Sequence, residues 1–184
     1  MSDEEDDIVL SELDDDELVQ QMFDDLYEGH KEEIEESTNI AATPSAVSDV
    51  LLDIDAAPLW NAGLERLELV DGVAGEPGCV GNAHYIEGSR RYVLQDRLIE
   101  AEPGQYFKSE IRGGGMRAVI ETRLDEIPSG TRVTIRWVGT GTNPITKLML
   151  PILKSQVSKR TQEDLRALRD LVERRPGGRG SNRP

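Results

Sequence analysis

Cysteine and histidine are scarce in this chain, which has one cysteine and two histidines among 184 residues. The single cysteine, Cys79, permits neither an internal disulfide nor a cysteine metal cluster. The sequence also lacks a His pair, an Asp-x-Asp-x-Asp-Gly loop and a Gly-x-Ser-x-Gly motif, which argues against zinc, calcium and serine hydrolase sites. We therefore expect no metal site, no cofactor and no nucleophilic triad.

Long apolar runs and concentrated positive charge are missing as well. No apolar run approaches the roughly 20 residues that a membrane-spanning helix needs, so we expect no stable membrane insertion. The opening MSDEEDD does not have the basic and apolar regions of a secretory signal, and we expect a cytoplasmic protein. The formal net charge is −15, whereas phosphate binding needs a cationic face. A nucleic-acid partner is therefore not expected.

Charge is concentrated at the two ends of the chain. Residues 1–30 contain 13 acidic and no basic residues, whereas residues 174–184 contain four arginines and no acidic residue. Acidic runs of this kind usually form solvated extensions. We predict three parts: an acidic N-terminal extension over residues 1–32, a folded domain over residues 33–173 and a disordered Arg/Gly tail over residues 174–184.

An amphipathic helix is predicted in the extension, over about residues 12–28, because Leu18, Met22 and Leu26 recur at helical spacing. Its other face is nearly all carboxylate, so the helix either folds back on its own domain or contacts a basic groove of a protein partner. The extension resembles the opening helix of bacterial corrinoid methyltransferase proteins. The cobalamin-ligating Asp-x-His-x-x-Gly motif of that family is absent here. The resemblance therefore implies a fused extension and no cobalamin function.

Hydrophobic periodicity in the remaining chain predicts an α+β fold. Apolar residues at three- and four-residue spacing predict a long helix over residues 142–173 with one buried stripe. Pro151 has no N–H, so we expect a kink or restart of this helix near Leu150. Two short helices are predicted over residues 44–54 and 55–60. Alternating patterns bounded by turn residues predict seven strands, over residues 33–42, 64–70, 80–87, 91–100, 105–111, 116–126 and 131–139.

The predicted order is one strand, two short helices, six strands and a long helix. This is the order of a helix-grip fold, in which a curved antiparallel sheet wraps around a helix. Residues 37–72 resemble the opening of the START-like polyketide cyclase/dehydrase and lipid-transport superfamily, with Asp53, Pro58 and Trp60 matching its signature. Residues 129–134 match the Gly-Thr-x-Val-Thr hairpin of that superfamily, and Leu150-Pro151 matches a common start of its last helix. The resemblance covers about residues 34–173 and implies the helix-grip fold, with carriers, cyclases and co-chaperones among the members.

Candidate ligand-binding residues lie on the strand faces that point toward the long helix. Successive side chains of a strand point to opposite faces. This places Ile135 and Trp137 on one face of the last strand, and Met116 and Ile120 on the matching face of the strand before it. This inner face is apolar, which suits either a pocket for a hydrophobic ligand or plain core packing. Gly113–Gly115 is predicted to be a wide turn or a mobile flap. The full set of ligand-binding candidates is Trp60, His84, Tyr92, Met116, Ile120, Ile135, Trp137, Leu148 and Ile152.

Three functions remain open from the sequence. The first is binding or transport of a hydrophobic small molecule, such as a lipid or a polyketide-like compound, in a cavity between the sheet and the C-terminal helix. The second is an aromatase/cyclase-type enzyme, for which two or more polar groups must converge in the cavity. The third is an interaction protein that works through the acidic helix. No residue is assigned as catalytic, and the polar candidates for the cyclase are His84, Tyr92, Tyr106 and Arg112.

Overall fold

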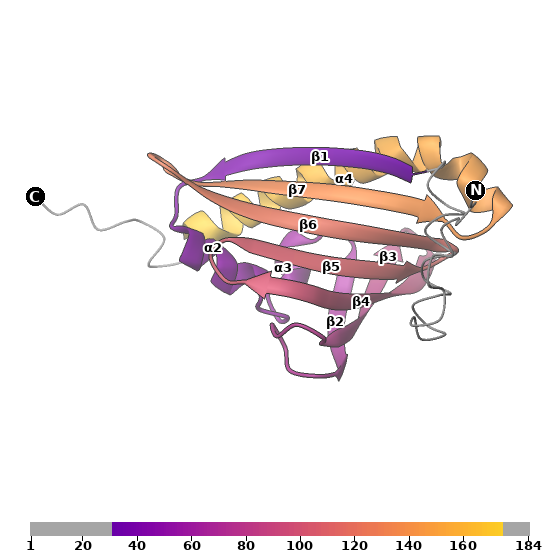
Figure 1. Ribbon diagram of the computed structural model, residues 1–184, viewed down its shortest axis with the longest axis horizontal. Helices are drawn as coiled ribbons and strands as arrows, with labels where there is room; N and C mark the ends of the chain where they lie inside the picture. The colour runs from indigo at the N-terminus through magenta and orange to yellow at the C-terminus, as the bar shows by residue number, and fades with distance from the viewer. Residues whose placement is uncertain (1–30, 175–184) are drawn as a thin grey trace, which may run out of the picture. The chain divides into compact units, whose positions relative to one another are not determined.

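The computed structural model describes residues 31–174, and within them it contains a seven-stranded sheet and three helices (Figure 1). The acidic helix predicted over residues 12–28 and the tail from residue 175 lie outside the described residues. The elements are β1 (Lys31–Ile40), α2 (Pro44–Leu51), α3 (Ala57–Trp60), β2 (Leu64–Asp71), β3 (Val80–Glu87), β4 (Arg90–Glu102), β5 (Tyr106–Gly113), β6 (Met116–Ile127), β7 (Gly130–Gly141) and α4 (Pro144–Arg174).

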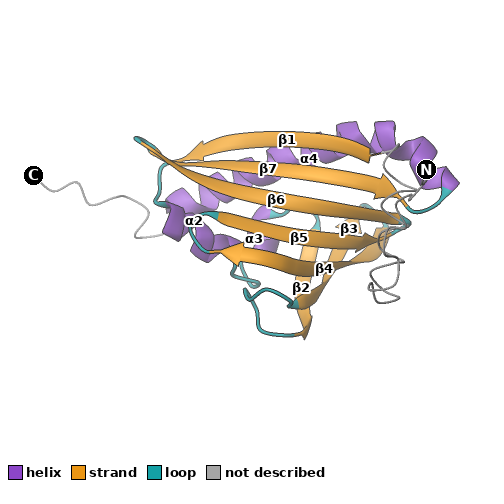
Figure 2. Ribbon diagram, in the orientation of Figure 1, coloured by secondary structure: helices purple, strands orange, loops and turns teal. Residues whose placement is uncertain are grey.

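The strands form one sheet in the order β1-β7-β6-β5-β4-β3-β2, and the pairs from β2 to β7 are all antiparallel. Figure 2 shows the helices behind the sheet, with α4 running along the side of β1 and β7. The predicted helix-grip α+β fold is confirmed. Because each of β2 to β6 pairs with the next strand in the chain, short turns join most of them, which is why the turn residues located the strands correctly.

The turn between β5 and β6 consists of two residues, Gly114 and Gly115, with φ of +60° and +79°. Such values suit a two-residue hairpin and favour glycine at both positions. The predicted wide turn is therefore wrong. The turn is also held in place, because the Thr146 hydroxyl of α4 donates a hydrogen bond to the Gly115 carbonyl at 2.9 Å.

Helix α4 begins after Asn143, whose side-chain oxygen accepts a hydrogen bond from the Thr146 backbone N–H at 2.9 Å. This bond makes Asn143 the N-cap of α4. The helix then continues through Pro151 as far as Arg174, so the predicted restart near Leu150 is wrong.

The buried core divides into three clusters on the helix-covered side of the sheet. The first lies where α2 and the second half of α4 meet β1, β5, β6 and β7, and it includes Val47, Val50, Phe107, Val133 and Leu168. The second contains Ile34, Ala118 and Trp137. The third contains Ala57, Leu64 and Ala83, from α3, β2 and β3. The core is therefore strongest at the end of the sheet that carries α2.

Burial is unequal along α4. In its second half, Leu165, Leu168 and Val172 are at most 2% exposed, whereas in its first half Ile145, Met149 and Ile152 are 75%, 43% and 58% exposed. The prediction of one buried stripe is confirmed for the second half. In the first half Val157 still packs against the second core cluster, whereas Ile152 is not an inward-facing residue. Figure 1 shows the reason: the first half of α4 lies at the end of the sheet away from α2 and α3.

Truncating the two halves of α4 will have different effects on stability. Leu168→Ala removes a fully buried side chain, and we expect the free energy of unfolding to fall by about 2–5 kcal/mol. Ile152→Ala removes an exposed side chain and is expected to change it by less than about 0.5 kcal/mol. Urea unfolding followed by circular dichroism measures both values. A loss above 2 kcal/mol for Ile152→Ala would show that the first half of α4 is covered in solution.

Candidate functional site

The inner face of the sheet is the face that carries the three core clusters. Val133 and Trp137 of β7 and Ala118 of β6 point to this face and are buried. Arg136 points to the opposite face, where its guanidinium donates to Glu33 and Glu121 at 2.7 and 3.1 Å. The predicted faces of β6 and β7 are therefore confirmed. The β6–β7 register places four arginines of this hairpin on the outer face: Arg117, Arg123, Arg132 and Arg136.

Three predicted ligand-binding residues come together in the second core cluster. Met116 and Ile120 of β6 pack against the cluster that contains Trp137, and Ile120 and Trp137 are direct partners in the β6–β7 register. The Trp137 ring lies over Gly139, where an added Cβ would overlap the indole. Glycine at this position therefore lets the large ring lie flat along β7.

The middle of the sheet carries inward-facing residues that belong to none of the three core clusters. On β4 they alternate with exposed neighbours, and the β5 members are their cross-strand partners, which places the whole set on the inner face, yet all of them keep partial solvent exposure. Partial exposure on the inner face means that α4 does not pack tightly over them. We call this set the inner patch, and it consists of Leu94, Asp96, Leu98, Ser109 and Ile111.

Asp96 is the charged residue of the inner patch. Burial raises the pKa of its carboxyl group to about 6, and the hydroxyl of Ser109, which donates a hydrogen bond to it, partly offsets this rise. The carboxylate oxygen Oδ1 is inaccessible to solvent and has no hydrogen-bond partner. A buried acceptor without a partner costs free energy, so this position needs a reason beyond packing.

A polar cluster borders the inner patch at the start of β4. The Tyr85 and Tyr92 rings stack with their centroids 5.3 Å apart, and the Arg160 guanidinium lies 4.8 Å from the centre of the Tyr85 ring. Arg160 also donates to the Tyr92 hydroxyl at 3.3 Å and to Glu87 at 2.8 Å. Burial raises the pKa of Tyr85 to about 12, and its hydroxyl accepts a hydrogen bond from Asn61 at 3.3 Å. Both phenol oxygens therefore already accept hydrogen bonds from protein donors.

The loop after α3 is fixed to α4 by two side chains. The backbone N–H of Ala62 donates to Asp164 at 2.7 Å, and Arg160 donates to the Ala62 carbonyl. Burial raises the pKa of Asp164 to about 6, although the bond from Ala62 and the charge of Arg160 lower it. This loop and the polar cluster together close one end of the inner patch.

Two sequence-predicted site residues lie away from the inner face. His84 points to the outer face of β3, opposite to Ala83 and Tyr85, and its Nε2 is 3.1 Å from the exposed Glu68 carboxylate. Its placement in the ligand site was wrong because alternation shows only that His84 and Tyr85 oppose each other. Ile152 is exposed on α4, as described above. The side chain of Leu148 lies outside what the structure describes.

The remaining candidates lie on the inner side. Trp60 at the end of α3 and Ile135 of β7 pack against the first core cluster, and the Trp60 Nε1 is buried without a hydrogen-bond partner. Tyr92 belongs to the polar cluster. Of the polar groups proposed for a cyclase, Tyr106 and Arg112 face outward, because their partners across the ladders are Glu102 and Gln95 on the outer face of β4.

Sequence reasoning missed Tyr85, Asp96, Ser109 and Arg160. Asp96 had a visible signal, since Tyr92, Leu94, Asp96 and Leu98 form one period-two series that is apolar except for the carboxylate. Arg160 had none, because a charged residue outside the apolar stripe of a helix is expected to face solvent. The sheet curves far enough for β3 and β4 to reach that side.

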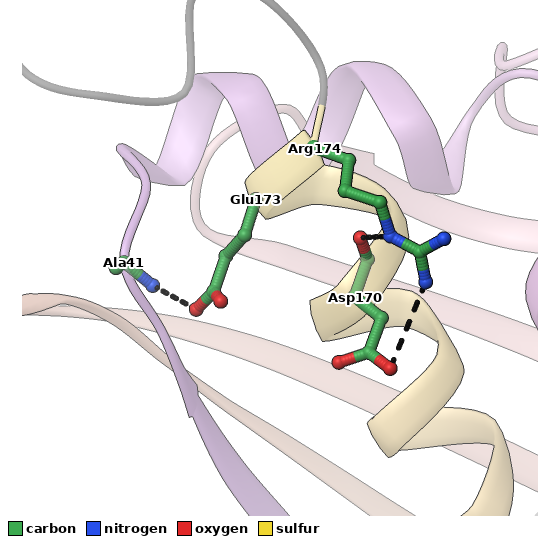
Figure 3. Close-up of a pocket in the computed structure, with 4 residues that line it drawn as sticks. All are labelled: Ala41, Asp170, Glu173 and Arg174. Atoms are coloured by element: carbon green, nitrogen blue, oxygen red, sulfur yellow. Dashed lines mark hydrogen bonds and ion pairs between the residues drawn. The ribbon is translucent and has the colours of Figure 1, made fainter.

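Two surface hollows lie near the C-terminal end of α4, away from the inner patch. One of about 400 Å³ is lined by Ala41, Asp170, Glu173 and Arg174 at the end of α4 (Figure 3). Glu173 accepts a hydrogen bond from the Ala41 N–H at 2.9 Å, and Arg174 donates to the Asp170 carbonyl at 2.8 Å. These polar groups satisfy one another and seal the junction of β1 and α4, so the inner patch remains the better candidate.

Within residues 31–174, no cluster of three or more His, Cys, Asp and Glu side chains is arranged to hold a metal ion. None of the helices described here has the length and apolarity required to cross a membrane.

Replacing Asp96 by asparagine will raise stability at neutral pH. The pKa of Asp96 is raised on folding, so its ionisation disfavours the folded state, and this cost grows as the pH rises from about 4 to 7. Relative to wild type, Asp96→Asn should gain up to about 3 kcal/mol in unfolding free energy at pH 7.5 and almost nothing at pH 4. Denaturant unfolding across this pH range measures the difference, and Asp164 titrates equally in both proteins. Lower stability of the variant at pH 7.5 would contradict this account.

Known structures share this architecture. The chain resembles the Zhui aromatase/cyclase from Streptomyces sp. R1128, with a TM-score of 0.67, 17% identity and coverage of 79% of this chain and 96% of the other. For Ara h 8.0201 the TM-score is 0.61 at 14% identity, with 77% and 97% covered. For a protein of unknown function from Staphylococcus aureus the TM-score is 0.64 at 14% identity, with 78% and 94% covered. At these identities the likeness shows the fold.

No curated protein matches this chain. The family model for polyketide cyclase / dehydrase and lipid transport matches residues 31–173, which is most of the sequence and all but one of the residues that the structure describes. The chain therefore belongs to the polyketide cyclase / dehydrase and lipid transport family.

Proposed function

We propose that this protein binds a hydrophobic small molecule between the inner face of the sheet and α4. The observation that carries the proposal is the inner patch, in which Leu94, Leu98 and Ile111 face inward without joining the buried core. Apolar side chains that face a helix normally pack against it. Their partial exposure indicates space that an apolar ligand would fill. The family match supports the same interpretation.

The available apolar surface is sufficient for useful affinity. A ligand face of about 200 Å² buried against such side chains contributes about 5 kcal/mol at ~25 cal/mol per Å², before the entropy cost of binding. One or two polar contacts would then bring the affinity into the micromolar range. A lipid-like or polyketide-like molecule has an apolar surface of this size.

Binding is favoured over cyclisation by the state of the polar groups. The hydroxyls of Tyr85 and Tyr92 already accept hydrogen bonds from Asn61 and Arg160. His84 faces outward. In the inner patch this leaves Asp96, with its partner Ser109, as the ionisable group able to meet a ligand.

One observation keeps an aromatase/cyclase-type activity as the second candidate. A carboxyl group with a pKa near 6 is suited to proton transfer near neutral pH, and Asp96 has that property. Aldol closure needs a second group to hold the ketone oxygen, and Tyr85 would have to give up its bond with Asn61 to do so. An assay for cyclised product with a poly-β-keto substrate separates the two functions.

Filling the inner space will block binding of a fluorescent apolar probe. Ile120→Trp enlarges an inward-facing side chain of β6, and we expect it to weaken binding of 1-aminoanthracene at least about tenfold by displacing the probe. Arg123→Trp adds the same ring to the exposed outer face of the same strand and should leave the affinity within about twofold. Fluorescence titration measures both, with circular dichroism to check folding. Equal affinities in both variants would refute a site between the sheet and α4.

A further inference from the structure

We propose that Asp96 is the polar anchor of this site and selects hydrophobic ligands that carry a hydrogen-bond donor, a hydroxyl or an amine, at one end. This inference rests on the proposed function and adds the chemical class of the ligand. It follows from the position of the carboxylate, from its incomplete hydrogen bonding and from the charges around it.

The position of Asp96 is central in the inner patch. Leu94 and Leu98 flank it on β4, and its cross-strand neighbours on the same face are Gly81 of β3 and Ile111 of β5. Gly81 has no side chain and Ile111 has no polar group, so neither can satisfy the carboxylate. An apolar ligand lying along the two leucines would therefore bring its end group to Asp96.

The hydrogen bonding of Asp96 is half complete. Ser109 donates to the carboxylate, while Oδ1 has no partner among the described residues and is not reached by solvent. The residue as a whole keeps partial exposure, so a rotation of the carboxyl group would bring Oδ1 to a ligand that lies against the inner patch. A hydrogen-bond donor on the ligand would give Oδ1 the partner that it lacks. An ether at the same place would leave it unpaired, and a carboxylate would repel it.

The charged and titratable groups around Asp96 are committed to other partners. Tyr85, on the same face of β3, is bonded to Asn61. Arg160 of α4 contacts Glu87, Tyr92 and Ala62, and Asp164 of α4 accepts from Ala62. Within residues 31–174, no ion pair joins Asp96 to a Lys or Arg. The site therefore offers its ligand a carboxylate acceptor whose charge is not balanced by a nearby Lys or Arg.

The proposal predicts a preference between two probes whose oxygen carries either a hydrogen or a methyl group. We expect the wild-type protein at pH 7.5 to bind 2-naphthol at least about tenfold more tightly than 2-methoxynaphthalene, because a hydrogen bond to a charged acceptor contributes at this level. Asp96→Leu should bind both equally, with the affinity for 2-methoxynaphthalene retained. Asp96→Asn keeps the shape of the side chain and should reduce the preference at least about threefold. Isothermal titration calorimetry measures each affinity.

Two further arms make the test specific. Asp125→Asn removes a carboxylate from the exposed outer face and should keep the full preference. 2-Naphthylmethylamine distinguishes the source of the donor: tighter binding than 2-naphthol identifies an amine as the natural end group, and weaker binding identifies a hydroxyl. Lowering the pH from 7.5 to 5 should reduce the 2-naphthol preference in wild type and not in Asp96→Asn, because the acceptor becomes protonated.

The outcomes separate the anchor from the site itself. If wild type binds both naphthalene probes equally, or if Asp96→Leu keeps the preference, the anchor is wrong while the hydrophobic site stands. If neither probe binds to wild type, the proposed function fails, and the anchor fails with it.

Discussion

The second half of α4 holds this structure together, because it is the part of the helix that the sheet encloses. Leu165, Leu168 and Val172 are almost fully buried, in one cluster with side chains of α2, β1 and β7. One helix of 31 residues cannot cover the inner face of seven strands. Where it packs tightly the core is complete, and where it does not the sheet keeps inward-facing side chains that are partly exposed. The candidate site is therefore a consequence of how the core is distributed.

The contacts around that site divide structural from functional polar groups. Arg160 and Asp164 fix the loop after α3 to the helix, and Tyr85 and Tyr92 are satisfied by protein donors. These groups stabilise one end of the inner space by completing each other's hydrogen bonds. Asp96 differs from them because one of its oxygens has no partner. That difference, more than the number of polar residues, is the basis for proposing Asp96 as the group that meets a ligand.

The fold was readable from the sequence, whereas the site was readable only in part. Turn residues and alternation located the strands because the sheet is a sequential meander with a period of two. These rules could not show which strand residues face α4, or which helix residues the sheet covers. Alternation showed that His84 and Tyr85 oppose each other without showing which one faces α4. Helical spacing located the apolar stripe on α4. It did not show that the sheet leaves Ile152 exposed, or that Arg160 contacts the curved edge of the sheet.

Asp96 is best understood by comparing what it costs the empty fold with what it offers a ligand. Its raised pKa means that folding opposes its ionisation, so the free protein carries this cost at neutral pH. A leucine or asparagine at this position would remove the cost of ionisation. A residue that lowers stability in the free protein and lies among apolar side chains facing the helix is typical of a binding site, where function is retained at the expense of stability. The packing of the fold does not require the carboxylate, whereas the proposed role as a ligand anchor gives a reason for it.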